Sequence, residues 1–184
     1  MAGMKISAEV RRRAKKIRLL LMDVDGVLTN GTVCLQAFPD GSVAELKVFN
    51  AHDGAGVKLA SIVGLRSGMI TGRNSPATTQ RAHEMGVEFV FQGQARKTAA
   101  YEEILQRGGV KDEETAYIGD DLPDLPLLKR AGLAVAVGDA VIEVKRAAHY
   151  VTRANGGGGA AREVVELILR AQGRWEASIP KALA

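Results

Sequence analysis

A chain of 184 residues with 46% hydrophobic and 25% charged residues is long enough to bury a core, and its composition is typical of a globular protein. Aromatic residues are only 4%, which argues against a stacking surface for bases, and no apolar run reaches the roughly 20 residues of a membrane span. The single cysteine, Cys34, excludes an intrachain disulfide and a multi-cysteine metal site; we interpret it as a small apolar side chain on a strand. We therefore expect one cytoplasmic domain over residues 1–184, without a membrane or nucleic-acid partner.

Positive charge is concentrated at the N-terminus. Seven of the 25 Lys and Arg residues lie within residues 1–18, so the rest of the chain is net acidic. Val10, Ala14 and Ile17 recur at helical spacing, which predicts a basic lead-in helix over 1–17 with one apolar face. A basic cluster can also bind nucleic acid. We favour the helix, because such clusters are weak evidence alone and the chain has few aromatic residues.

A strand over 18–23 comes next, followed by a predicted hairpin over 31–49 whose turn is marked by Pro39, Asp40 and Gly41. Apolar residues alternate along the hairpin, which predicts that one of its faces is buried. That face consists of Val33, Leu35, Leu46 and Val48.

The remainder of the chain alternates strands with helices. Strands are expected at 65–71, 87–91, 115–119, 133–137 and 149–152. Helices are expected at 54–63, 75–85, 96–107, 123–131, 140–147 and 160–172, before a loose tail over 173–184. This alternation predicts an α/β fold, a three-layer Rossmann-like parallel sheet with helices on both faces. Only the hairpin and one helix fit between the first two strands of the sheet, so we expect no large cap domain.

Acidic residues gather where two predicted strands end. They are Asp23, Asp25, Asp120, Asp121 and Asp124. A single acid at such a junction more often caps a helix, but several at one edge of a sheet would repel one another without a cation. Oxygen ligands without a His or Cys set favour Mg²⁺ over zinc. Together with the nearby Lys97, such a site is suited to phosphoryl transfer.

Four stretches, in this order, resemble the motifs of the haloacid dehalogenase-like phosphohydrolases. They are DVDGVLT (23–29), ITGR (70–73), GQARK (93–97) and GDDLPDLP (119–126). Further stretches are similar to the family of 3-deoxy-D-manno-octulosonate 8-phosphate phosphatases. They are FNAHDGAGVKLA (49–60), QRAHEMGVEFVFQG (80–93) and YVTRANGGGGAAREVVELIL (150–169). The resemblance covers residues 17–173.

The resemblance implies roles for the strand-end acids. Asp23 would attack phosphorus and form an aspartyl-phosphate, and Asp25 would protonate the leaving sugar oxygen and later deprotonate the hydrolytic water. Mg²⁺ would be held by the Asp23 carboxylate, the Asp25 backbone carbonyl and Asp120. Asp124 and Asp121 would orient ligands and waters around the ion, although Asp121 could equally be an acid at a helix N-terminus.

The phosphate would be held by Thr71, Gly72 and Lys97. The recognition of the sugar acid is predicted to involve an adjacent set of polar, basic and loop residues, for which ordinary surface charge is the alternative. This set is Asn50, Ala51, His52, Asp53, Gly54, Lys58, Arg73 and Arg81. His52 and Gly158 differ from the family pattern, which leaves the preferred sugar open. The glycine run over 156–159 could offer amides to an anion or be a flexible helix lead-in.

We therefore expect a Mg²⁺-dependent phosphatase that hydrolyses 3-deoxy-D-manno-octulosonate 8-phosphate in lipopolysaccharide biosynthesis. The alternatives are a phosphatase of a related nine-carbon sugar acid 9-phosphate and a non-catalytic binding module on the same fold. The resemblance implies a homotetramer in which the hairpins pack together and partner chains help to close the site.

Overall fold

The computed structural model describes residues 6–182, which form a six-stranded sheet, a separate hairpin and two helical layers. All neighbouring strands of the sheet are parallel, in the order β5-β4-β1-β6-β7-β8. Their bounds are β1 (Leu19–Met22), β4 (Arg66–Ile70), β5 (Phe89–Phe91), β6 (Thr115–Gly119), β7 (Leu133–Ala136) and β8 (Tyr150–Val151). Every residue of β1 is buried, because the central strand of such a sheet is covered on both faces.

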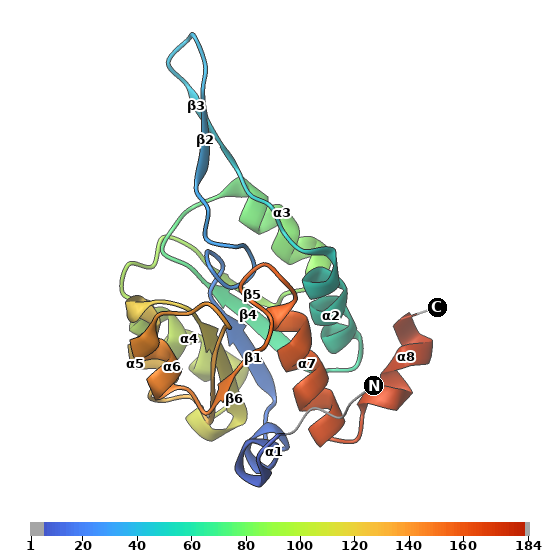
Figure 1. The fold of residues 1–184 in the computed structure, drawn as a ribbon. Helices are drawn as coiled ribbons and strands as arrows, with labels where there is room; N and C mark the ends of the chain where they lie inside the picture. The colour runs from blue at the N-terminus through green and yellow to red at the C-terminus, as the bar shows by residue number, and fades with distance from the viewer. Residues whose placement is uncertain (1–5, 183–184) are drawn as a thin grey trace.

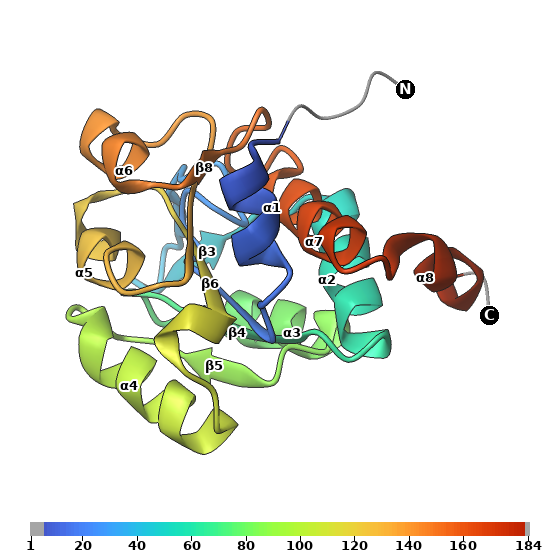
Figure 2. The same ribbon diagram turned by 90° about the horizontal axis from the view of Figure 1, so that it is seen from below.

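Helices cover both faces of the sheet (Figures 1 and 2). One layer contains α2 (Ala51–Ile62), α3 (Pro76–Met85) and α7 (Ala160–Ala171), with α1 (Ala8–Ala14) and α8 (Trp175–Ala182) beside α7. The other contains α4 (Lys97–Gly108), α5 (Leu125–Leu128) and α6 (Ile142–Ala147). Two short 3₁₀ helices, η1 (Asp112–Glu114) and η2 (Leu122–Asp124), flank β6. The predicted three-layer parallel fold is confirmed, and residues 6–182 contain no large cap.

The lead-in helix forms over α1, which is capped by the side chain of Ser7. The predicted apolar face is confirmed, since Val10, Ala14 and Ile17 are all buried in the core. The part of this prediction that concerns residues 1–5 lies outside the described residues. Across residues 6–182, no helix combines the length and the apolar character that crossing a membrane requires.

The hairpin, β2 (Cys34–Ala37) paired with β3 (Val43–Leu46), projects away from the body of the molecule (Figure 1). The prediction of a buried hairpin face is wrong for the single chain, because Leu35 is 60% exposed, Leu46 62% and Val48 71%. Cys34 is exposed as well. The alternation does mark strands, but Leu35 pairs with Glu45 and Leu46 with Cys34, so the two leucines lie on opposite faces of the hairpin rather than on one. Within residues 6–182 no second layer covers this ribbon.

The prediction of a loose tail over 173–184 is also wrong where the structure describes it. Trp175 begins α8 and is only 7% exposed. The guanidinium groups of Arg162 and Arg170, both from α7, lie over its ring at 5.1 and 4.8 Å from the centroid. The segment is therefore fixed by an aromatic anchor between cations, a contact that its composition does not reveal. Residues 183–184 lie outside the described range.

Candidate active site

Three neighbouring strands end at one cleft. Asp23 follows β1, Thr71 follows β4 and Asp120 follows β6, and β1 lies between the other two strands. In open parallel sheets this edge, where the chain switches direction across the sheet, is the usual place for a ligand. The cleft has a volume of about 240 Å³. It is lined by Asp23, Asp25, Thr71, Gly72, Arg73, Gln94, Ala95, Lys97, Asp120, Asp121, Pro123 and Asp124.

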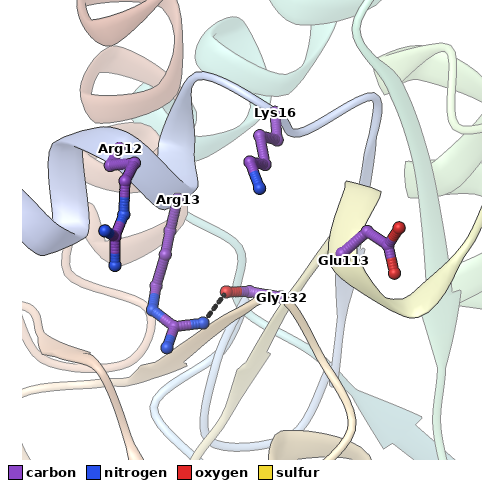
Figure 3. Close-up of a pocket in the computed structure, with 5 residues that line it drawn as sticks. All are labelled: Arg12, Arg13, Lys16, Glu113 and Gly132. Atoms are coloured by element: carbon purple, nitrogen blue, oxygen red, sulfur yellow. Dashed lines mark hydrogen bonds between the residues drawn. The ribbon is translucent and has the colours of Figure 1, made fainter.

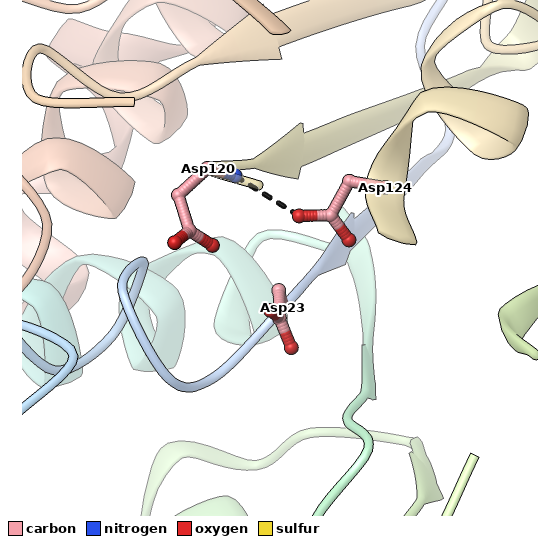
Figure 4. A group of neighbouring side chains, drawn as sticks. All are labelled: Asp23, Asp120 and Asp124. Carbon is pink, nitrogen blue, oxygen red and sulfur yellow. Dashed lines mark hydrogen bonds between the residues drawn. The ribbon is translucent and has the colours of Figure 1, made fainter. Parts of the chain in front are cut away.

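Three carboxylates converge in this cleft (Figure 4). One oxygen each from Asp23, Asp120 and Asp124 lie within 4.8 Å of one another. Burial, with the negative charges of Asp23 and Asp124, raises the pKa of Asp120 to about 8. Burial also raises the pKa of Asp23 to about 6, against the opposing charge of Lys97. Such a cluster resists full ionisation without an added cation.

Asp124 is saturated by contacts with the protein. Its Oδ1 accepts hydrogen bonds from Lys97 Nζ at 2.7 Å and from the Tyr117 hydroxyl at 2.6 Å. Its Oδ2 accepts from the backbone amide of Asp120 at 2.9 Å and that of Asp121 at 3.4 Å. Asp124 is therefore placed to hold its neighbours rather than to offer a free oxygen to an ion, and its predicted role around the metal stays a prediction.

Two oxygens in the cluster remain without a partner. Oδ1 of Asp23 and Oδ1 of Asp120 are both buried and accept no hydrogen bond from the described residues. A hard divalent cation with oxygen ligands would satisfy both, so the donor set fits Mg²⁺. The carboxylate of Asp25 is not part of this cluster, and its backbone carbonyl stays a predicted ligand. Asp121 caps η2, its Oδ1 accepting the next amide at 2.7 Å, which is the alternative left open by the sequence.

Lys97 is the buried cation of the site. It is the first residue of α4 and is 5% exposed, and its Nζ lies 2.9 Å from Asp23 Oδ2. Burial disfavours its charged form, but the charges of Asp23 and Asp124 outweigh that effect and raise the pKa of Lys97. Thr71, 2% exposed, and Gly72 line the same cleft. The structure thus brings together the residues predicted for phosphate and metal.

Gly26 allows the loop after β1 to approach Asp120. Its φ of +94° is in the left-handed region, and a Cβ placed there would lie 2.0 Å from Asp120 Oδ2. Only glycine combines this backbone conformation with so close an approach. The motif glycine is therefore a spatial requirement of the carboxylate cluster.

The glycine run over 156–159 packs against the same loop. The amide of Gly157 donates to Val27 O at 2.9 Å, and a Cβ on Gly156 would lie 1.8 Å from Gly26 O. The amides of the other three glycines also have protein acceptors. The run is thus a tight packing element, and its amides are not free for an anion.

Two residues at the base of the hairpin contact the cleft residues Asp25 and Arg73, and the sequence pattern does not predict either contact. Lys47, whose side chain is 4% exposed, forms an ion pair with Asp25. Glu45 Oε1 accepts a hydrogen bond from Arg73 Nε at 3.0 Å. Residues 45 and 47 share one side of a strand, so the period of two could have paired them, but only the orientation of the hairpin reveals their partners.

Most predicted substrate residues lie outside the cleft of the single chain. Of that set only Arg73 lines the cleft; the others are Asn50, Ala51, His52, Asp53, Gly54, Lys58 and Arg81. Asp53 is directed elsewhere, because its two oxygens accept the amides of Gly159 at 3.1 Å and Arg162 at 2.8 Å, at the start of α7.

The remaining members of that set surround the start of α2. Asn50 caps the helix by accepting the amide of His52 at 2.7 Å. Arg81 donates to Asn50 O at 3.1 Å, and a side chain on Gly54 would collide with its guanidinium. His52 and Lys58 are exposed, as is the neighbouring Ala51.

A second pocket lies at the opposite end of the sheet, beneath α1 (Figure 3). It is lined by Arg12, Arg13, Lys16, Glu113 and Gly132. Arg13 Nη1 donates to Gly132 O at 2.9 Å, just before β7. Part of the N-terminal positive charge thus anchors α1 to the sheet, far from the carboxylates.

The profile of the haloacid dehalogenase-like hydrolase family matches residues 68–164. The 3-deoxy-D-manno-octulosonate 8-phosphate phosphatase of Escherichia coli is 41% identical over 171 residues, which are 93% of this chain and 89% of that protein. The crystal structure of the Yersinia pestis phosphatase of that name has a TM-score of 0.88 at 43% identity, covering 93% and 90% of the two chains. The Moraxella catarrhalis phosphatase of that name, solved with a magnesium ion, a phosphate ion and KDO, has a TM-score of 0.88 at 38% identity, covering 94% and 97%.

Proposed function

We propose the function of this chain on the basis of its family. The chain belongs to the haloacid dehalogenase-like hydrolases. It hydrolyses 3-deoxy-D-manno-octulosonate 8-phosphate to the free sugar acid and phosphate. The proposal rests on one observation. Asp23, Asp120 and Lys97 come from three different segments of the chain, and their side chains meet at one edge of the sheet. The Escherichia coli and Yersinia pestis relatives described above are named as phosphatases of that sugar acid phosphate. We place the reaction of this chain in lipopolysaccharide biosynthesis on that basis.

The proposed reaction has two displacements. A carboxylate oxygen of Asp23 attacks phosphorus while the bond to the sugar oxygen breaks, and Asp25 gives a proton to that oxygen. In the second step Asp25 takes a proton from water, whose oxygen attacks the phosphoryl group and frees Asp23. Splitting one hard displacement into two lowers each barrier.

The other cleft residues stabilise charge in this scheme. Lys97 Nζ, 2.9 Å from Asp23 Oδ2, also offers donors to the phosphoryl oxygens, as does the hydroxyl of Thr71. Mg²⁺, which Asp23 and Asp120 would hold, supplies Lewis-acid neutralisation of the phosphate charge. Asp124 keeps Lys97 in place.

The test is phosphate release from the octulosonate phosphate by the wild type, Asp23→Asn and the matched surface variant Glu143→Gln, each with Mg²⁺ or with a chelator. We expect turnover by the wild type and Glu143→Gln with Mg²⁺ alone. Turnover by Asp23→Asn at the wild-type rate would contradict the assignment of Asp23 as the nucleophile. Failure of the wild type on every phosphate monoester offered would favour the non-catalytic alternative.

The exact sugar acid needs a separate measurement. His52 differs from the family pattern, which keeps the nine-carbon 9-phosphate as an alternative substrate. Arg73 and Arg81 are the guanidinium groups proposed to bind the sugar carboxylate, since arginine pairs with carboxylates through two hydrogen bonds. A panel of eight- and nine-carbon sugar acid phosphates beside neutral sugar phosphates ranks these possibilities by kcat/KM.

We also propose that the chain assembles as a homotetramer through its hairpins, in the cytoplasm. The support is the exposed apolar surface of the hairpin, including Leu35, Val43 and Leu46, each at least 60% exposed. Such a ribbon is marginally stable alone, and clustered apolar surface indicates a protein contact. In such a tetramer, contacts with neighbouring chains would also help to bring to the cleft the predicted substrate residues that lie outside it in the single chain.

A further inference from the structure

The base of the hairpin contacts a residue of the cleft, Asp25, through Lys47. This residue directly follows β3, yet its side chain is only 4% exposed, which is rare for a lysine without a specific partner. Its Nζ forms an ion pair with Oδ1 of Asp25 and lies 3.7 Å from Glu45 Oε1. Lys47 therefore gives up solvation in order to contact the carboxylate that the proposed function uses as acid and base.

The two oxygens of Asp25 are not equivalent. Oδ1 is occupied by the ammonium group of Lys47. Oδ2 is buried, accepts no hydrogen bond from the described residues, and lies 4.0 Å from Nε of Arg73, another residue that lines the cleft. An ammonium group has three donors and no acceptor, and the carbonyl oxygen of a protonated carboxyl group accepts better than its hydroxyl oxygen, so the contact of Lys47 with Oδ1 favours a proton on Oδ2.

We propose that Lys47 is a positioning residue that fixes the Asp25 carboxyl with its transferable proton on Oδ2. This inference rests on the proposed function, because it assigns a partner to the residue that acts there as general acid. In the first displacement the bond from phosphorus to the sugar oxygen breaks, its electron pair stays on that oxygen, and the Oδ2 proton moves to it. A sugar hydroxyl and an Asp25 carboxylate result, and the carboxylate charge is then balanced by Lys47.

Glu45 and Arg73 complete a charge-balanced group with this pair. Glu45 Oε1 accepts from Arg73 Nε at 3.0 Å, and both lie beside the Lys47–Asp25 pair. These four side chains thus join the hairpin base to the loops after β1 and β4, and their charges balance once Asp25 has given up its proton. The alternative role for Lys47, direct binding of the substrate phosphate, predicts equal effects on all phosphate esters, which makes the two roles separable.

The experiment compares two leaving groups in a single turnover with enzyme in excess over substrate. The octulosonate phosphate releases a sugar alkoxide that must be protonated, whereas p-nitrophenyl phosphate releases a phenolate that departs without a proton. Release of sugar or of nitrophenolate reports the first displacement alone, so the second step does not obscure it. The variants are Lys47→Met, Lys47→Arg and Asp25→Asn, with Lys15→Met, an exposed lysine at the far end of the molecule, as the matched control.

For Lys47→Met we expect sugar release to slow about 100-fold, the cost of misplacing a reacting group, while nitrophenolate release stays near the wild-type rate. Lys47→Arg should recover most of the loss, and Lys15→Met should match the wild type for both substrates. Asp25→Asn should show the same selectivity more strongly. Thermal unfolding of each variant confirms that it is folded.

Equal slowing of both substrates in Lys47→Met, or no slowing of either, would overturn the inference. If Asp25→Asn slowed sugar release and nitrophenolate release equally, the inference would also be overturned, and so would the proposed role of Asp25 as the general acid. Failure of the wild type on the octulosonate phosphate contradicts only the proposed substrate. The comparison is then made with whichever alkyl phosphate of the panel the enzyme hydrolyses.

Discussion

The hydroxyl of Tyr117 donates a hydrogen bond to Asp124 Oδ1 over 2.6 Å, and neither residue reaches solvent. Burial, with the charge of Asp124, raises the pKa of Tyr117 well above its usual range, so the phenol remains a donor. Tyr117 lies inside β6, whereas Asp124 also holds Lys97. The strand interior thereby sets the position of the cationic group in the cleft.

Replacing Tyr117 by Phe should therefore lower both stability and rate. The lost hydrogen bond to a buried charge should reduce the free energy of unfolding by about 1–3 kcal/mol, measured by denaturant titration. Turnover should fall because Lys97 loses part of its support. A variant with unchanged stability and rate would show that Lys97 and the backbone amides of Asp120 and Asp121 hold Asp124 without the phenol.

The second prediction uses two glycines with positive φ. Gly26→Ala should cost backbone strain of about 1–3 kcal/mol and also displace Asp120, because its Cβ would meet that carboxylate. Gly41→Ala is the matched control, since its φ is +84° and no atom lies within 4 Å of the added Cβ. Both variants should lose stability, but only Gly26→Ala should lose stabilisation by Mg²⁺. Equal Mg²⁺ responses in thermal unfolding would contradict this.

The third prediction concerns pH in the metal-free protein. The pKa of Asp120 rises from its ordinary 3.8 to about 8, so between these values the folded chain binds more protons than the unfolded chain. The free energy of unfolding should then fall as pH rises through this window. Asp23, Asp124, Lys97 and Asp121 are the charged groups around Asp120.

Mg²⁺ should oppose that fall, because it binds the ionised carboxylates. It should raise the thermal midpoint more at pH 8 than at pH 5, where it must first displace a proton. Asp120→Asn should flatten the pH dependence and abolish the Mg²⁺ response. Equal Mg²⁺ shifts at both pH values would count against the cluster as the metal site.

The fourth prediction tests the hairpin as a subunit contact. Leu46→Lys places a charge on the exposed apolar ribbon and should shift the proposed tetramer toward smaller species, as measured by light scattering after gel filtration. Ile142→Lys, at a similarly exposed apolar residue on α6, is the control and should leave the assembly unchanged. An unaltered mass for Leu46→Lys, or a monomeric wild type, would contradict the hairpin contact.

The fifth prediction concerns the C-terminal helix. Trp175→Ala should lower the free energy of unfolding by about 3 kcal/mol, because a buried ring between two guanidinium groups is lost. Turnover of the folded fraction should persist, since α8 contributes no residue to the cleft. A stability equal to that of the wild type would indicate a weakly attached helix.

The strand ends could be predicted from the sequence because they combine two local signals. Short apolar runs mark buried strands, and the acids that follow Met22 and Gly119 come directly after them. Parallel pairing then requires these residues to meet at one edge. The cluster of Asp23 and Asp120 is thus a consequence of local pattern and sheet direction together.

The contacts that sequence could not predict depend on orientation between distant segments. Lys47 meets Asp25 only because the base of the hairpin lies beside the loop after β1. Asp53 accepts backbone amides at the start of α7, more than a hundred residues away along the chain, although its position in a polar loop favoured a substrate role. Leu46 pairs with Cys34, whereas Leu35 pairs with Glu45, and this register separates the two leucines onto opposite faces. Periodicity indicates that side chains share a face, but not what that face meets.

Leu46 is the last residue of β3 and Lys47 follows it directly; the side chain of Leu46 is exposed, whereas that of Lys47 is buried against the proton donor. A neighbouring chain that packs against Leu46 would therefore also hold Lys47 in position. The rate per molecule should therefore drop as the enzyme is diluted below the concentration at which its chains stay together, and crosslinking the chains beforehand should prevent that drop.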